Sequence, residues 1–139
     1  MKVTRTILLP GLLAGAIVLA ACGGGQPAAT EGPAISAEAQ KYAALVGDAT
    51  AGKQKLEGTC SSCHGPDAKG ISGLGKDLTT SEYAIGLPDA ELILFLAKGR
   101  PASDSLNTTG VDMPPRGGNP ALTDQDLADI VAYVRTLEK

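Results

Sequence analysis

The chain has 139 residues, with 12 Lys and Arg against 15 Asp and Glu, which is the length of one small domain with appendages. This acidic balance argues against nucleic acid or an anionic lipid surface as a partner. One Phe, three Tyr and no Trp leave such a domain few large rings with which to build a core.

The N-terminus has the pattern of a secretory signal. Lys2 and Arg5 precede an apolar run over residues 7–21 that Pro10 interrupts. This run is shorter than the roughly 18 to 20 apolar residues of a typical spanning helix. We therefore predict a signal peptide over residues 1–21, with an uncleaved membrane anchor as the alternative.

The run ends in Leu19-Ala20-Ala21-Cys22, which resembles the lipobox of bacterial lipoproteins. In that motif the cysteine is acylated and becomes the mature N-terminus. Two or more acyl chains give stable membrane anchoring, whereas one holds only marginally. The resemblance implies an exported protein that is lipid-anchored through Cys22 and faces the periplasm or the cell exterior; a stray cysteine in a signal peptide is the alternative.

Residues 22–47 are predicted to form a linker. The segment "GGGQPAATEGPA" is rich in Gly, Pro and Ala and is typical of a flexible tether. Within the linker, the pattern of residues 36–46 indicates a short helix that Ser36 caps and Gly47 ends. The compact domain is then expected to span residues 48–139.

The pattern of that domain predicts helices separated by loops. The last helix is the best specified, because Thr123 and Asp126 have capping-box spacing and an apolar stripe follows at helical period. No stretch alternates as a strand would, so we expect an all-α fold. The other predicted segments are a helix over 50–60 capped by Asp48 or Thr50, a glycine-rich loop over 65–78, a brief helix over 81–85, a helix over 88–99 and a loop over 102–120.

The first of these helices leads into Cys60-Ser61-Ser62-Cys63-His64, which has the C-x-x-C-H spacing of c-type haem attachment. Two thiols three positions apart, on about one helical turn, can each bond one of the two vinyl groups of haem. The next residue then lies under the iron, where an imidazole nitrogen can bind it. The motif predicts one covalent haem c attached through Cys60 and Cys63, with His64 as a metal ligand.

Other uses of a close cysteine pair fit the sequence less well. A thioredoxin-like dithiol requires a βαβ setting, which the pattern does not indicate. A structural zinc site requires four ligands, and His64 is the only histidine of the chain. Apart from Cys22, only Cys60, Cys63 and His64 offer the thiolate and imidazole groups that such a zinc site uses.

Met113 is the candidate for the second face of the iron. It is the only methionine besides Met1, and it lies in "VDMPPRGG", about fifty residues after His64. Pro114 and Pro115 stiffen an extended backbone here, so the loop can present a thioether with little conformational freedom. The alternative role, filling a gap in the core, suits a glycine- and proline-rich loop poorly.

Residues 48–139 resemble the class I cytochromes c, which are small monohaem electron carriers. The stretch "GDATAGKQKLEGTCSSCHGPDAKG" is similar to the first helix and haem motif of that family, and "MPPRGGNPALTDQDLADIVAYVRTL" to its methionine loop and C-terminal helix. The resemblance implies that the N- and C-terminal helices cross around one covalent haem, with Gly52 against Tyr133. It also implies that a carbonyl between residues 74 and 76 accepts a hydrogen bond from His64, although Lys76 stands where many relatives have proline.

Further expectations concern the residues around the haem. Four lysines that flank the motif, Lys53, Lys55, Lys69 and Lys76, are candidates for steering a partner, with a plain solvated face as the alternative. Candidates for the haem propionates are Tyr83, Arg100 and Arg116. Candidates for lining the haem, or for ordinary core, are Leu74, Leu78, Leu96, Val111 and Leu122.

Together these patterns predict a membrane-tethered electron carrier, not an enzyme, whose partners are redox proteins of an electron-transport chain. One alternative is a fixed subunit of a larger respiratory or photosynthetic complex, such as alternative complex III or a terminal oxidase. Another is a haem-based gas sensor or peroxidase-like enzyme, which would need an open position where Met113 is expected to bind.

Overall fold

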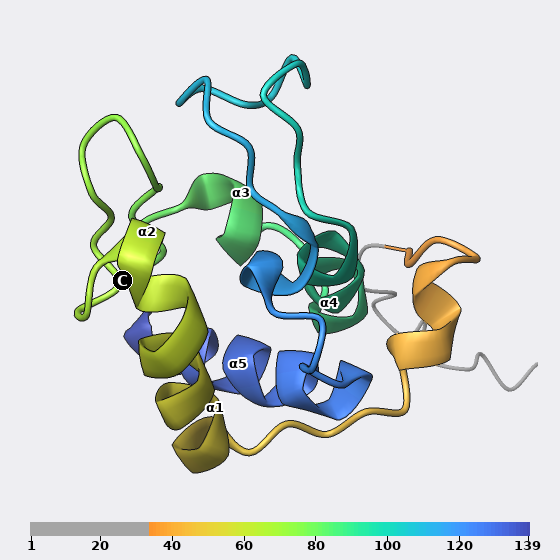
Figure 1. The fold of residues 1–139 in the computed structure, drawn as a ribbon. Helices are drawn as coiled ribbons and strands as arrows, with labels where there is room; N and C mark the ends of the chain where they lie inside the picture. The colour runs from red at the N-terminus through yellow and green to blue at the C-terminus, as the bar shows by residue number, and fades with distance from the viewer. Residues whose placement is uncertain (1–33) are drawn as a thin grey trace, which may run out of the picture.

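The computed structural model describes residues 34–139, where regular structure is helical apart from two isolated β-bridges, Ile71 with Gly75 and Arg100 with Met113. The all-α prediction is thus confirmed for this part of the chain (Figure 1). The predicted signal peptide, Cys22 and the start of the linker lie outside the described residues. The elements are η1 (Ala39–Tyr42), α1 (Ala49–Lys55), η2 (Leu56–Cys60), α2 (Ser61–His64), α3 (Glu82–Ile85), α4 (Asp89–Lys98), η3 (Pro115–Gly118) and α5 (Asp124–Leu137).

The first helix of the domain runs further than its sequence pattern indicates. Asp48 caps it, since its carboxylate accepts hydrogen bonds from the backbone N–H groups of Thr50 and Ala51 at 2.7 and 3.1 Å. Beyond α1 the helical path continues through the π-helical turn η2 and into α2. It ends at Gly65, whose φ is 76°. The whole C-x-x-C-H motif therefore lies at the end of this helical segment rather than in a loop.

The last helix, α5, follows its prediction closely. Thr123 and Asp126 form the capping box, in which each side chain accepts a hydrogen bond from the other's backbone N–H. The apolar stripe faces the core, with Leu137 half-buried at its end. Its buried members are Leu127, Ile130, Val131 and Val134.

Helices α1 and α5 pack against each other at Gly52. A Cβ at this position would lie 1.8 Å from the carbonyl oxygen of Asp129 and 2.9 Å from the backbone nitrogen of Ile130. The crossing of the two helices is thus as the resemblance implies, but its nearest contact is different. Gly52 approaches the backbone of α5, whereas Tyr133 is not among its nearest neighbours.

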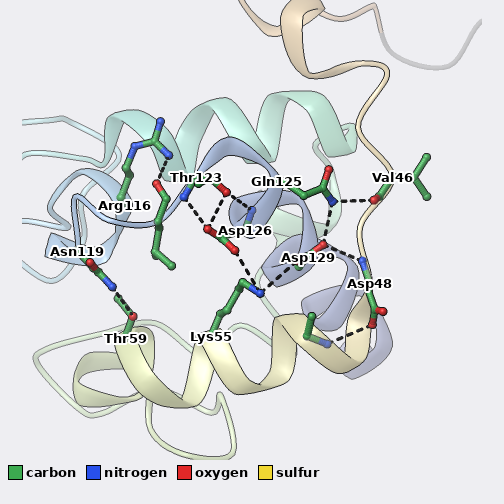
Figure 2. Close-up of polar contacts among 12 residues, drawn as sticks. Val46, Asp48, Lys55, Thr59, Arg116, Asn119, Thr123, Gln125, Asp126 and Asp129 are labelled. Carbon is green, nitrogen blue, oxygen red and sulfur yellow. Dashed lines mark hydrogen bonds and ion pairs between the residues drawn. The ribbon is translucent and has the colours of Figure 1, made fainter.

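A polar cluster joins the same two helices (Figure 2). Lys55 of α1 extends its ammonium between Asp126 and Asp129 of α5, at 3.2 and 3.3 Å from their carboxylates. Asp129 is only 6% exposed, and its carboxylate also accepts hydrogen bonds from the Asp48 backbone N–H and the Gln125 side chain, each at 2.9 Å. The carboxylate of Asp129 therefore has three partners, namely an ammonium group, a backbone N–H and a side-chain amide.

The segment before α1 packs on the domain. Ala39 and Tyr42 are 0% and 2% exposed and lie against α4, so core packing begins before Asp48 (Figure 1). Of the short helix predicted over residues 36–46, only the 3₁₀ helix η1 forms. In a 3₁₀ helix, residues i and i+3 lie in line, which lets Ala39 and Tyr42 enter the core together.

The two middle helices form as predicted. The Ser81 hydroxyl accepts a hydrogen bond from the backbone N–H of Ala84 and caps α3. Gly99 ends α4 with a φ of 70°, a conformation that glycine adopts without strain. Within residues 34–139, no helix has the length and apolarity needed to cross a membrane.

Candidate functional site

All four residues predicted to hold a haem line one cavity of about 590 Å³, a volume within the range of about 300 to 1,000 Å³ that is typical of ligand sites. Cys60, Cys63 and His64 reach it from the end of the first helical segment, and Met113 from the loop before η3. The five apolar residues that we expected to surround the haem also line the cavity: Leu74, Leu78, Leu96, Val111 and Leu122. Residues distant in sequence thus meet around one largely apolar space.

Cys60 and Cys63 are not joined in a disulfide, and they lie in the last turns of the helical segment. Burial raises the pKa of the Cys60 thiol to about 11, and the neighbouring Cys63 adds to this shift. Among residues 34–139, no group of three His, Cys, Asp or Glu side chains is arranged to hold a metal ion.

The imidazole of His64 is oriented by the loop that follows the motif. Its Nδ1 lies 2.7 Å from the carbonyl oxygen of Lys76. A carbonyl only accepts hydrogen bonds, so Nδ1 carries the proton and the lone pair is on Nε2, the nitrogen available to bind a metal. The carbonyl expected between residues 74 and 76 is therefore that of Lys76, and the lack of a proline there does not prevent the contact.

Met113 is held by its backbone. Its N–H donates to the carbonyl of Arg100 and its carbonyl accepts from the N–H of Arg100, both at 2.8 Å. Pro114 continues the chain in an extended conformation, with φ −71° and ψ 153°. This pairing joins the methionine loop to the end of α4.

The three candidates for the propionates differ in their surroundings, although all of them line the cavity. Arg116 donates to the carbonyl of Leu122 at 2.7 Å and pairs with Asp124, so its guanidinium holds the start of α5. Arg100 lies over the rings of Tyr83 and Phe95, with its guanidinium carbon 4.2 and 4.8 Å from their centroids. Tyr83 is therefore engaged through its ring face.

Three of the four lysines around the motif, Lys53, Lys55 and Lys69, are paired with carboxylates. Lys55 turns toward Asp126 and Asp129, as described above. Lys69 pairs with the nearby Asp67 at 3.0 Å. The plain alternative, a solvated face with local ion pairs, fits these contacts better than a steering cluster.

Sequence reasoning did not identify the residue that organises the loop before Met113. The Asn107 side-chain amide donates to the carbonyls of Pro101 and Val111 at 3.1 and 2.8 Å. Its oxygen accepts from the backbone N–H groups of Thr109 and Gly110 at 3.1 and 3.0 Å. An asparagine three residues before a glycine is typical of such a turn, and this signal was present in the sequence.

The donor atoms suit a covalently attached haem. Two thiols three positions apart, an imidazole with a free Nε2, and a thioether from another segment all face an apolar cavity. The cytochrome c family model matches residues 49–138. The chain belongs to the cytochrome c family. Members of this family carry covalently bound haem c and transfer electrons.

Two relatives cover most of the domain. Over 87 residues the chain is 32% identical to cytochrome c-555 of Prosthecochloris aestuarii, an alignment that covers 63% of this chain and 85% of the relative. Over 92 residues it is 33% identical to cytochrome c-554(548) of Halomonas halodenitrificans, covering 66% of this chain and 99% of the relative. Both are small cytochromes, which agrees with a single-domain class I cytochrome c.

Proposed function

We propose that this cytochrome c is a one-electron carrier that holds a single haem c through thioether bonds to Cys60 and Cys63, with His64 and Met113 as the two iron ligands. The observation that carries the proposal is that these four side chains, from two distant segments, line one apolar cavity. When bound, haem c supplies an iron that gains and loses one electron.

The surrounding residues would set the reduction potential of the haem iron. The Lys76 carbonyl fixes the ring of His64 and strengthens its donor nitrogen. A thioether ligand from Met113 favours the reduced iron and so raises the reduction potential. If His64 and Met113 both bound the iron, no open position would be left for a gas or a peroxide, which is why we propose electron transfer rather than a sensor or an enzyme.

For the location, we propose an exported protein anchored at the outer face of a bacterial membrane through lipid on Cys22. The apolar run over residues 7–21 and the sequence Leu19-Ala20-Ala21-Cys22 support this. Covalent haem attachment in bacteria also follows export. The carrier would then exchange electrons with redox proteins while its tether keeps it at the membrane.

A second candidate is a fixed subunit of a larger electron-transport complex. It is favoured by apolar side chains that remain exposed beside the cavity, notably Leu106 at 59% and Val111 at 37%. Purification from native membranes under mild conditions distinguishes the two. Co-purification of stoichiometric partners supports the subunit, and a monomeric cytochrome supports the shuttle.

Substitution of the predicted distal ligand tests the proposal directly. In Met113→Ala we expect the low-spin His/Met absorption spectrum to be lost and the reduction potential to fall, because the thioether no longer stabilises the reduced iron. Spectroelectrochemistry of the haem-loaded protein measures both. Ser105→Ala, in the same loop and exposed, is the matched control and should behave as the wild type. An unchanged spectrum in Met113→Ala would show that another group binds the iron.

Substitution of the predicted lipid site tests the anchor. Cys22→Ser removes the thiol that would be acylated, so we expect the cytochrome to move from the membrane fraction to the soluble fraction after cell breakage. Fractionation followed by a haem stain measures this. A salt wash of wild-type membranes is the control, because it removes protein bound only by charge. Retention of the variant in membranes points to an uncleaved apolar segment or to a tight complex.

A further inference from the structure

The loop over residues 101–112 begins and ends at one pair of residues. It leaves the chain at Arg100 and returns at Met113, and these two residues are joined by two reciprocal backbone hydrogen bonds of 2.8 Å. Figure 1 shows the loop as a long excursion that projects beyond α4 and α3. The position of Met113 is therefore coupled to that of Arg100, although thirteen positions separate them in sequence.

The base of this loop has little room to shift. Gly99, directly before Arg100, packs so closely that a Cβ there would lie 2.2 Å from the carbonyl oxygen of Met113. Inside the loop, Asn107 bonds four backbone groups on both of its arms. Asp112 also accepts from the backbone N–H of Ala102. Because these hydrogen bonds join the two arms of the loop, we expect a displacement at the base to move the whole loop as a rigid unit.

The side chain of Arg100 holds this base against the helices. It is 14% exposed, and its guanidinium lies over Tyr83 of α3 and Phe95 of α4. The two rings pack edge to face, with centroids 5.2 Å apart. A cation stacked on aromatic rings is stabilised more strongly when water is excluded from the contact.

The same side chain also reaches into the loop. Its Nη1 donates to the carbonyl of Leu106 at 3.4 Å, and its Nε lies 3.7 Å from the carboxylate of Asp104. Arg100 thus contacts three parts of the structure at once: the aromatic pair through its ring-stacked face, the loop through its edge, and Met113 through its backbone.

We propose that Arg100 is a positioning residue for Met113. By anchoring the base of the loop to the aromatic pair, it keeps the Met113 thioether at the distal side of the cavity and limits how often the thioether moves away. The proposal rests on the proposed role of Met113 as an iron ligand, and it assigns to Arg100 a task that is separate from any contact with a propionate.

The test measures how readily Met113 leaves the iron in the haem-loaded protein. Added imidazole binds ferric iron only after the thioether has moved away, so its binding rate reports loop opening. In Arg100→Lys the charge remains but the planar stack is lost, and we expect this rate to rise about tenfold or more and the Met–iron charge-transfer absorption to weaken. Hydrogen exchange at the Met113 amide should accelerate by a similar factor.

Two ring variants separate stacking from hydrogen bonding. Tyr83→Leu removes one stacked ring at a position that is 40% exposed, so it should fold and raise the imidazole rate about fivefold, in the range expected for a cation–ring contact. Tyr83→Phe keeps the ring and should leave the rate as in the wild type. If the phenol hydroxyl mattered instead, Tyr83→Phe would act like Tyr83→Leu, which would overturn the proposal.

Asp129→Asn is the control for general destabilisation. Asp129 is 6% exposed, its carboxylate bonds Asp48, Lys55 and Gln125 at the junction of α1 and α5, and none of these four residues lines the cavity. Its substitution should lower stability without changing the imidazole rate. If Asp129→Asn raised that rate as much as Arg100→Lys, loosening of the whole fold would be the cause, and the proposal would be wrong.

Failure of this inference is distinguishable from failure of the proposed ligation. If wild-type protein lacks the Met–iron absorption, the ligand assignment fails, and hydrogen exchange at Met113 in Arg100→Lys still reports the coupling. If the absorption is present but Arg100→Lys changes only the pH dependence of the reduction potential, Arg100 acts on a propionate and the positioning role is refuted.

Discussion

Gly52 illustrates how much of the architecture depends on a single missing side chain. At this residue α1 approaches the backbone of α5 so closely that a Cβ would lie 1.8 Å from the carbonyl oxygen of Asp129. Any side chain here must push the two helices apart, because a backbone carbonyl cannot rotate out of the way as a side chain can. Since α2 continues the path of α1, this contact also positions the cysteines relative to α5.

We expect Gly52→Ala to destabilise the protein by about 1–3 kcal/mol, the usual cost of overpacking, even though alanine is the better helix former. Guanidinium unfolding of the haem-loaded protein, followed by circular dichroism, measures the effect. Gly58→Ala is the matched control, because a Cβ there meets no atom within 4 Å. Equal stability of Gly52→Ala and the wild type would mean that the helices separate at little cost.

At the scale of elements, the junction of α1 and α5 is held by charge as well as by packing. Burial opposes the ionisation of Asp129, yet hydrogen bonds from the Asp48 backbone N–H, from Gln125 and from Lys55 outweigh it and lower its pKa. The pKa of Asp126 is also lowered, first by its hydrogen bonds with Thr123 and then by Lys55. The carboxylate of Asp126 therefore belongs both to the capping box of α5 and to the cluster that joins α5 to α1 (Figure 2).

The sign of the pH dependence follows from these shifts. The folded protein binds fewer protons at Asp129 than the unfolded chain does, so this contribution is fully present above the unfolded pKa of about 3.9. It is lost as the pH falls through the lower, folded value. We expect Asp129→Asn to lose about 1–2 kcal/mol at neutral pH and to show a weaker loss of stability on acidification below about pH 4.

Unfolding curves collected between neutral and acidic pH test this expectation. Glu57→Gln is the control, because it alters only an exposed pair with Lys53, whose side chains are 50% and 56% exposed. An acid profile of Asp129→Asn that parallels the wild-type profile would contradict a lowered pKa at this carboxylate.

At the scale of the whole molecule, the segment before the family domain completes the core. The match to the cytochrome c family begins at residue 49, yet Ala39 and Tyr42 are fully buried against α4. Further contacts fix the segment at both ends. Gln125 of α5 donates to the carbonyl of Val46 at 2.8 Å, and Lys98 of α4 pairs with Glu38. The chain that leads back toward the predicted tether is thus attached to the domain on the α4 side.

Tyr42→Ala is expected to lower the free energy of unfolding by about 3–5 kcal/mol, as for other large aromatic side chains removed from a core. Val46→Ala, in the same segment but 85% exposed, should change it by less than about 0.5 kcal/mol. Thermal and denaturant unfolding of both variants provides the comparison. If the two variants were equally stable, the segment would be dispensable for the fold.

The sequence by itself determined where the main helices of the domain begin and the identity of the chemical groups. The caps at Asp48, Ser81 and Thr123 and the stop at Gly99 act on neighbouring backbone groups, so their effect can be predicted from local spacing. The pairing of two thiols with an imidazole in the C-x-x-C-H motif is local for the same reason. These features need no knowledge of the rest of the chain.

Only the tertiary structure decided what depends on contacts between distant segments. It selected the Lys76 carbonyl as the partner of His64 and the backbone of Asp129 as the surface against Gly52. It also turned Lys55 toward Asp129, and it buried Tyr42, which lies in the segment predicted to be a linker. Such contacts depend on how helices cross and loops return, and a one-dimensional pattern records neither. The link between Arg100 and Met113 belongs to this class, because its two backbone hydrogen bonds join segments that are separated by the whole loop over residues 101–112.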